Sequence, residues 1–211
     1  MKPVRREPPA SRAIEVRSAA DVRTLWFKMR DVPRRTEGRS KKRYERYYLG
    51  LYLLALAEHR LLRFPLKVLE GESSDFVLVG KSGEETGLEI TRATDEDLQA
   101  TMTRAERNLS DGPAIIASSF GYGGDQLEME WCALVRTAVE KKVAKLSGFK
   151  PASRYDVLVP DDTRMGSGDR RKVIQVLTPW VRELKRREPR LGTISVAASL
   201  DVLYDIGEHL W

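Results

Sequence analysis

The stretch SSDFVLVGKSGEETGLEIT, residues 73–91, decides the fold class of this 211-residue chain. Two short apolar runs, DFVLV and TGLEIT, flank the segment GKSGEE, whose glycines and polar side chains are typical of a hairpin turn. A third apolar run, FPLKVLE, precedes them at residues 64–70. The stretch therefore predicts three consecutive strands, of which the second and third form a hairpin.

Helices and further strands are predicted on both sides of this three-stranded unit. The spacing of apolar residues predicts helices over residues 41–62, 95–109, 126–146 and 170–187, and buried strands over residues 154–162, 193–199 and 200–206. Residues 114–117 are expected to form a strand or a buried turn, followed by a glycine-rich loop. An order of helix, three strands, helix, strand, helix and strand is typical of a single α/β layered domain.

Positive charge is concentrated at the N-terminus. Residues 1–46 hold 15 Lys and Arg against 6 Asp and Glu, whereas the rest of the chain is slightly acidic. We expect a basic tail over residues 1–38, containing a short helix that begins at Ser18, and a folded domain over residues 39–211. Such a basic block binds phosphate backbones in a salt-dependent way, unless it serves only as a solubilising tail. The nucleic-acid contacts predicted in it are Arg34, Arg35, Arg39, Lys41, Lys42 and Arg43.

The composition points to the cytoplasm. Cys132 is the only cysteine, so it cannot form an internal disulfide and is expected to be a small core residue. The basic start of the chain has no apolar stretch behind it, as a secretion signal would. The longest apolar run, LGLYLLALA, is about half the length that a membrane span needs. A cytoplasmic protein without membrane contact is therefore predicted.

Two carboxylates are expected to meet at one end of the sheet. Because strand side chains alternate, Asp75 and Val77 share one face, and Glu89 and Thr91 share a face opposite Leu88. If the two runs pair as a hairpin, Asp75 and Glu89 come together. Paired carboxylates bind Mg²⁺ or Mn²⁺, which lowers the pKa of a bound water and stabilises charge on a phosphodiester under attack.

This arrangement resembles the PD-(D/E)xK nuclease superfamily, in which an Asp begins one strand and Glu-x-Lys lies in the next. The resemblance covers residues 41–203 and implies a restriction-endonuclease-like α/β domain of three layers, with a central mixed β-sheet flanked by helices. SSD stands in place of the usual PD, and EIT in place of Glu-x-Lys. Thr91 therefore occupies the lysine position without a positive charge to orient the attacking water or neutralise the transition state.

A lysine on a helix is the candidate for this missing charge, as in superfamily members that supply it from a neighbouring helix. The apolar residues of the helix over residues 126–146 fall in one sector, and Lys142 lies inside that sector. Lys145, at the edge of the sector, is the second candidate. A lysine in a buried stripe must reach a carboxylate, a phosphate or solvent. The alternative is a lysine that extends to solvent near the helix end.

Further candidates lie on the flanking helices. Glu45 shares a helix face with Tyr48 and Tyr52, thirty positions before Asp75, where the superfamily often has an additional acidic residue. The alternative for Glu45 is an ion pair with Lys41 or Lys42 in a surface turn. Glu58 is the second acidic candidate, and Gln99 resembles a helix glutamine of some such nucleases.

The resemblance implies a metal-dependent endonuclease acting on DNA or, less favoured, RNA, in a defence, mobile-element or repair setting. Asp75 and Glu89 would hold Mg²⁺ or Mn²⁺, with Glu45 as a ligand or general base and Lys142 as the positive charge. A catalytically inactive member that binds nucleic acid or a protein partner is the alternative. A homodimer or a complex with a protein partner is the expected assembly. An α/β domain unrelated to nucleases is the third hypothesis.

Overall fold

A seven-stranded mixed β-sheet runs through the residues that the computed structural model describes, which are 13–31, 40–93, 125–148, 154–160, 170–199 and 202–206. The strands lie side by side in chain order. Neighbouring strands are antiparallel from β1 to β4, parallel from β4 to β6, and antiparallel between β6 and β7. The strands are β1 (Ile14–Val16), β2 (Leu66–Glu70), β3 (Phe76–Val79), β4 (Glu85–Ile90), β5 (Arg154–Pro160), β6 (Leu191–Ser199) and β7 (Val202–Asp205).

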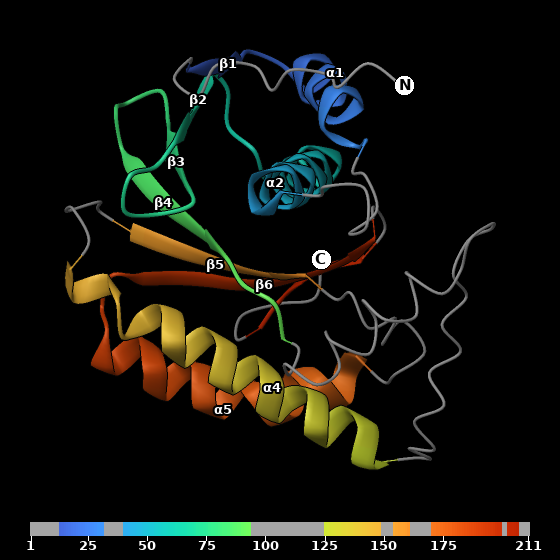
Figure 1. Ribbon diagram of the computed structural model, residues 1–211, viewed down its shortest axis with the longest axis vertical. Coiled ribbons are helices and arrows are strands. Elements are labelled where there is room, and N and C mark those ends of the chain that lie inside the picture. The colour runs from blue at the N-terminus through green and yellow to red at the C-terminus, as the bar shows by residue number, and fades with distance from the viewer. Residues whose placement is uncertain are drawn as a thin grey trace.

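Helices cover both faces of this sheet. On one side lie α1 (Ala19–Met29) and α2 (Lys41–Glu58), and on the other lie α4 (Asp125–Val143) and α5 (Arg170–Arg187), as Figure 1 shows. A short 3₁₀ turn, η2 (Leu146–Gly148), follows α4. The result is a mixed α/β domain of three layers, as the sequence predicts. The helix predicted over residues 95–109 and the strand or turn at 114–117 lie outside the described residues.

The alternation of strand side chains divides the core in two. Leu88 and Leu158 face α2 and pack in a cluster with Leu49 and Leu53 of that helix. On the opposite face, Val157 and its neighbours pack against α4 and α5 in a second cluster. β5 and β6 therefore contribute apolar side chains to both layers, which fixes their register.

The end of α2 lies four residues earlier than its apolar spacing predicts. Arg60 has a φ of 59°, and the helix closes with hydrogen bonds from Arg60 N to Ala57 O and from Leu61 N to Leu56 O. This pair of bonds is the Schellman arrangement, which satisfies the last carbonyls of a helix and stops it. The chain then turns towards β2.

Part of the predicted basic tail belongs to the domain. Ile14–Val16 pairs with β2 as the first strand of the sheet, and Val16 and Val22 are buried in the core beneath α2. Ser18 caps α1, because its hydroxyl accepts a hydrogen bond of 3.3 Å from Asp21 N. The prediction of a tail over residues 1–38 is therefore corrected for the described residues from 13 to 31.

No helix within the described ranges combines the length and apolar character needed to cross a membrane.

A carboxylate and lysine cluster as candidate active site

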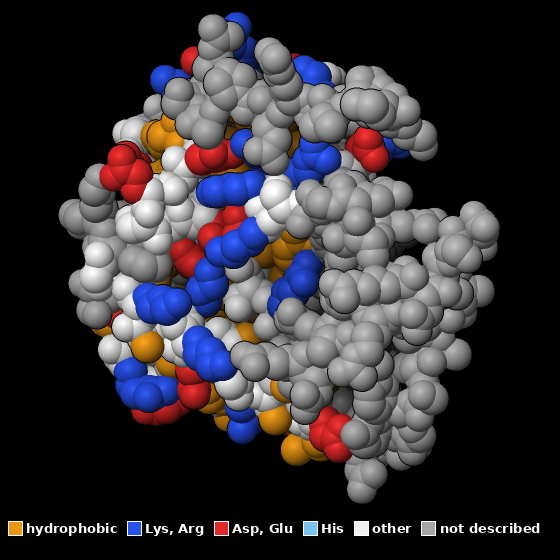
Figure 2. All heavy atoms as spheres, in the orientation of Figure 1, with side chains coloured by type: hydrophobic (Ala, Val, Ile, Leu, Met, Phe, Trp, Pro, Cys, Tyr) orange, Lys and Arg blue, Asp and Glu red, His pale blue; other side chains and the backbone are white. Residues whose placement is uncertain are grey.

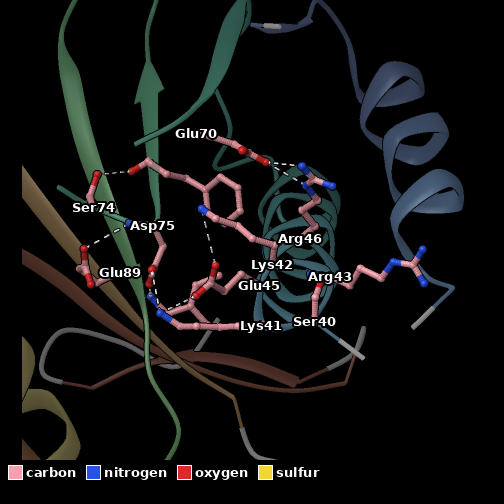
Figure 3. A network of polar contacts seen from close by, with 12 residues as sticks. Ser40, Lys41, Lys42, Arg43, Glu45, Arg46, Glu70, Ser74, Asp75 and Glu89 are labelled. Atoms are coloured by element: carbon pink, nitrogen blue, oxygen red, sulfur yellow. Dashed lines mark hydrogen bonds and ion pairs between the residues drawn. The ribbon is translucent and has the colours of Figure 1, made fainter. Parts of the chain in front are cut away.

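The hairpin of β3 and β4 places Asp75 beside Glu89. Phe76 pairs with Leu88 across the two strands, so the preceding Asp75 lies opposite Glu89. Each carboxylate accepts a backbone hydrogen bond from the other strand: Asp75 N donates to Glu89 Oε1 at 3.2 Å, and Ile90 N donates to Asp75 Oδ2 at 2.8 Å (Figure 3). The two predicted acids thus hold each other in place at the start of β3.

A tight turn between β2 and β3 delivers Asp75 to this position. Gly71 N donates to Asp75 O at 3.3 Å, and the Ser74 hydroxyl donates to Phe76 O at 2.8 Å. A Cβ on Gly71 would lie 2.3 Å from Ser74 O, so the turn closes only with glycine at this position. The local sequence GESSD therefore fixes the start of β3.

Lys142 of α4 contacts both carboxylates. Its Nζ donates to Asp75 Oδ2 at 3.2 Å and to Glu89 Oε2. The side chains are largely shielded from solvent, with exposed fractions of 18% for Lys142, 11% for Asp75 and 3% for Glu89. The structure therefore brings together the three residues that the sequence analysis singles out on three separate elements.

The environment shifts the proton equilibria of this pair. Burial raises the pKa of Glu89 above its usual value, and the contact with Lys142 opposes this rise only in part. Burial alone would lower the pKa of Lys142, but its contacts with Glu89 and Asp75 together outweigh burial and hold that pKa above its usual value. Lys142 is thus a charged ammonium at neutral pH.

Glu45 of α2 lies buried on the other side of Asp75, with 2% of its surface exposed. Lys41 Nζ is 3.1 Å from Glu45 Oε1 and 3.8 Å from Asp75 Oδ1, so one ammonium bridges the two acids (Figure 3). The contact with Glu45 is an ion pair without hydrogen-bond geometry. Burial, and then the charge of Asp75, raises the pKa of Glu45 despite Lys41 and Lys42. The expected pairing with lysines occurs, but around a buried acid rather than at the surface.

Of the remaining predicted residues, Lys42 pairs with Glu45, and the others make different contacts or lie outside the described ranges. Thr91 continues the β4–β5 ladder through its N–H to Leu158 O at 2.9 Å. Lys145 is exposed in the turn after α4, and Glu58, at the far end of α2 from Glu45, pairs with Arg23 at 3.0 Å. Lys42 points towards Glu45 in Figure 3, whereas Arg43 extends away from it. Gln99, Arg34, Arg35 and Arg39 lie outside the described residues.

A further cation, not singled out from the sequence, lies near these residues. The guanidinium of Arg92 stacks over the ring of Tyr44, with 3.5 Å from its central carbon to the ring centroid. Extending the strand alternation one residue beyond Thr91 would have placed Arg92 on the side of α2. Figure 2 shows that Lys and Arg side chains gather with acidic ones across the middle of this face of the molecule.

The donor atoms fit a hard divalent cation. Asp75 and Glu89 offer carboxylate oxygens, and Mg²⁺ is commonly held by one or two carboxylates together with waters and phosphate oxygens. Within the described ranges, no set of three or more His, Cys, Asp or Glu side chains is arranged to hold a metal, so Glu45 does not complete a three-residue set. Because Lys142 Nζ contacts one oxygen of each acid, a metal bound by both would take over or share the place of this ammonium.

Comparison with known proteins gives no relative from which to transfer a role. No family model, no curated protein and no solved structure matches this chain. Its function is therefore inferred from its own residues and their geometry.

Proposed function

We propose that this chain is a metal-dependent nuclease of the restriction-endonuclease-like type that hydrolyses phosphodiester bonds in DNA. The observation that carries the proposal is the contact of Lys142 with both Asp75 and Glu89. A lysine that is drawn from a helix into contact with two strand carboxylates supplies the positive charge that Thr91 lacks. Two acids and one lysine at the end of a hairpin are the residue types that this hydrolysis requires.

The order of elements supports the same proposal. Helix α2 is followed by the antiparallel strands β2, β3 and β4, then by α4, and then by β5 parallel to β4. The resemblance to the PD-(D/E)xK superfamily implies a helix, a three-stranded antiparallel unit, a helix and a further strand. Asp75 and Glu89 also lie at corresponding places, at the start of the second strand of this unit and inside the third.

The chemistry divides among the residues by charge. Asp75 and Glu89 would hold Mg²⁺ or Mn²⁺, which when bound supplies a water of lowered pKa and positive charge beside the phosphate. Lys142, whose ammonium stays protonated, stabilises the negative charge that develops on the phosphate oxygens.

Glu45 is suited to proton transfer. Its pKa is raised towards neutral pH. An acid or base transfers protons most effectively when its pKa lies near the working pH. Lys41, which contacts both Glu45 and Asp75, links this carboxyl to one of the two proposed metal ligands. In this proposal Glu45 takes up the proton that the attacking water loses.

The test uses the purified full chain with supercoiled plasmid, linear duplex DNA, single-stranded DNA and RNA, with and without Mn²⁺. We expect cleavage of DNA that requires Mn²⁺ and is abolished in Asp75→Ala and Glu89→Ala. Glu58→Ala is the matched control, because it removes a carboxylate from the distant end of α2. Cleavage by the Asp75 and Glu89 variants at the rate of wild type would refute the site.

A catalytically inactive nuclease fold that binds nucleic acid or a protein partner is the second candidate. It is favoured by the complete set of partners around the acids: all four carboxylate oxygens of Asp75 and Glu89 contact a lysine or a backbone N–H. Calorimetric titration with Mn²⁺ separates the two candidates. Binding that Asp75→Ala eliminates supports the nuclease, and no binding to wild type supports the inactive protein.

A further inference from the structure

Two exposed lysines, Lys141 and Lys145, lie on either side of Lys142 in the chain. Lys141 is in the last turn of α4, and Lys145 is in the turn that continues it. In this turn Ala144 N donates to Glu140 O at 2.9 Å, and Lys145 N donates to Lys142 O at 3.0 Å. Because these bonds keep the winding of the helix, the two exposed lysines lie one turn apart on the same side of it.

This side of α4 is turned away from α5 and leads to Lys142. Glu140 marks the side of α5, because its Oε1 accepts a hydrogen bond of 3.0 Å from Trp180 Nε1 of that helix. Measured from Glu140, a rotation of about 100° per residue places Lys141 at about 100° and Lys145 at about 140°. Lys142 follows at about 200°, where the helix turns towards the sheet. The exposed lysines thus occupy the surface between solvent and Lys142.

The two lysines border the carboxylate cluster and are free to bind a ligand. Lys142, their neighbour on the helix, contacts Asp75 and Glu89. Neither Lys141 nor Lys145 pairs with an acid in the part of the chain that the structure describes. In Figure 2, Lys and Arg side chains lie over this end of α4 as well as beside the acidic side chains in the middle of the face.

The acids of the cluster occupy the cations that lie closest to them. Three ammonium groups are paired in this way, those of Lys41, Lys42 and Lys142. A phosphodiester brought to the cluster is close to carboxylates, whose negative charge repels it. Unpaired cations beside the acids offset this repulsion, and Lys141 and Lys145 are cations of this kind.

We infer that Lys141 and Lys145 bind backbone phosphates of the DNA substrate next to the phosphate that is cleaved, and hold the strand against the carboxylate cluster. An ammonium on a long flexible side chain binds a phosphate as a point charge. Residues four apart on a helix have Cβ atoms about 6 Å apart, so the two side chains can contact neighbouring phosphates of one strand. The inference rests on the proposed function for its choice of DNA, and it adds a basic surface on the layer of α4 to the basic residues predicted near the N-terminus.

The experiment measures DNA binding by fluorescence anisotropy in EDTA, where metal-dependent cleavage cannot occur. The probes are labelled single-stranded DNA, duplex DNA and RNA of one sequence, each across a series of NaCl concentrations. The variants are Lys141→Gln, Lys145→Gln, the double Gln variant and the double variant with Arg at both positions. The control is Lys28→Gln with Lys81→Gln, which removes the same charge from two exposed lysines, one on α1 and one in the turn between β3 and β4. Tm is measured for every protein.

We expect each single Gln variant to weaken duplex binding about fivefold and to lower the slope of log affinity against log salt by about one. The double Gln variant should lower the slope by about two. Arg at both positions should keep the affinity and the slope, because the contacts depend on charge. The control should stay close to wild type. With Mn²⁺ present, the double Gln variant should raise KM for DNA more than it lowers kcat.

A double Gln variant that binds DNA as the control does would overturn the inference and leave the proposed function standing. The same holds if the variant lowers Tm without changing the salt slope, since the lysines would then only stabilise the C-terminal end of the dipole of α4. Tighter binding of RNA than of DNA by wild type would overturn the choice of DNA. Absence of binding by wild type to all three probes would overturn the inference, whereas binding through the two lysines without cleavage in Mn²⁺ would support the surface and refute the nuclease.

Discussion

Lys142 Nζ lies 3.2 Å from Asp75 Oδ2, although the two residues are 67 positions apart in the chain. The same ammonium donates to Glu89, so one cation serves two shielded acids. Burying a charge without a partner destabilises the folded state. The contact with Lys142 offsets this cost for both acids. Stability and the proposed chemistry therefore depend on the same three side chains.

Lys142→Met should destabilise the protein strongly. The change leaves Asp75 and Glu89 without their shared ammonium, and removing one partner of a buried ion pair costs about 3–5 kcal/mol. Urea denaturation measures the free energy of unfolding. Lys145→Met is the control, because Lys145 is exposed one turn later. If the two variants prove equally stable, Lys142 does not balance the buried acids.

Moving the lysine to position 91, where the superfamily has it, tests whether Lys142 supplies the positive charge that Thr91 lacks. Thr91→Lys alone should lower both stability and cleavage, because a second ammonium is brought near the first. In the double variant Thr91→Lys with Lys142→Met, the charge returns to the strand, and cleavage should recover well above that of Lys142→Met alone. Mn²⁺-dependent plasmid cleavage gives the comparison. A double variant no more active than Lys142→Met would show that position 91 cannot supply the charge.

Glu45→Gln should stabilise the protein at neutral pH and not under acidic conditions. The folded-state pKa of Glu45 is raised above its usual 4.5, so folding favours the protonated acid. The stability from this preference is fully present below pH 4.5 and is lost as the pH rises through the raised value. A permanently neutral Gln avoids that loss. For a chain of this size, each gain of about 1 kcal/mol in the free energy of unfolding raises Tm by roughly 2–4 °C.

Thermal unfolding of Glu45→Gln and wild type, at neutral pH and below pH 4.5, measures this difference. Glu58→Gln is the control, since Glu58 is half exposed at the other end of α2. If the gain in Tm is the same at both pH values, the prediction is wrong, because the gain does not depend on the ionisation of Glu45. If Glu45 also transfers protons, the variant gains stability while it loses cleavage.

Gly71→Ala should disturb Asp75 through the backbone. The new Cβ would lie 2.3 Å from Ser74 O, so the turn must open and the start of β3 must shift. We expect a loss of stability of about 1–3 kcal/mol and a fall in cleavage. Gly148→Ala provides the control, because a Cβ there meets nothing within 4 Å. Equal urea midpoints for the two variants would show that the turn adapts without moving Asp75.

The candidate cluster was accessible from the sequence because its members break strong periodic patterns. Lys142 stands inside an apolar helix face, and Asp75 and Glu89 flank apolar strand residues, so each is visible as an exception to a regular spacing. Their contact itself was a hypothesis, since spacing gives the face of a residue but not the packing of helices on a sheet. The α/β layered class followed from the order of elements, and the three layers from the family resemblance.

Other features depend on partners distant in the chain. Ile14–Val16 is a three-residue strand in a basic segment, and only its pairing with β2 makes it a strand. The last turn of α2 ends at Glu58 because Arg60 adopts a left-handed conformation, which its side chain does not favour. The stacking of Arg92 on Tyr44 requires α2 to lie against the end of β4. Of these, only the side of the sheet on which Arg92 lies has a local sequence signal, the alternation of strand residues.

The position of Asp75 between lysines of two layers has a consequence for the assembly of the protein. Lys41 reaches it from α2 and Lys142 from α4, so the full set of contacts exists only after both helical layers have docked onto the sheet. A chain with one layer still undocked has the acids but not the arrangement around them. On the nuclease function proposed above, a copy with one layer undocked lacks this arrangement and should not cleave DNA.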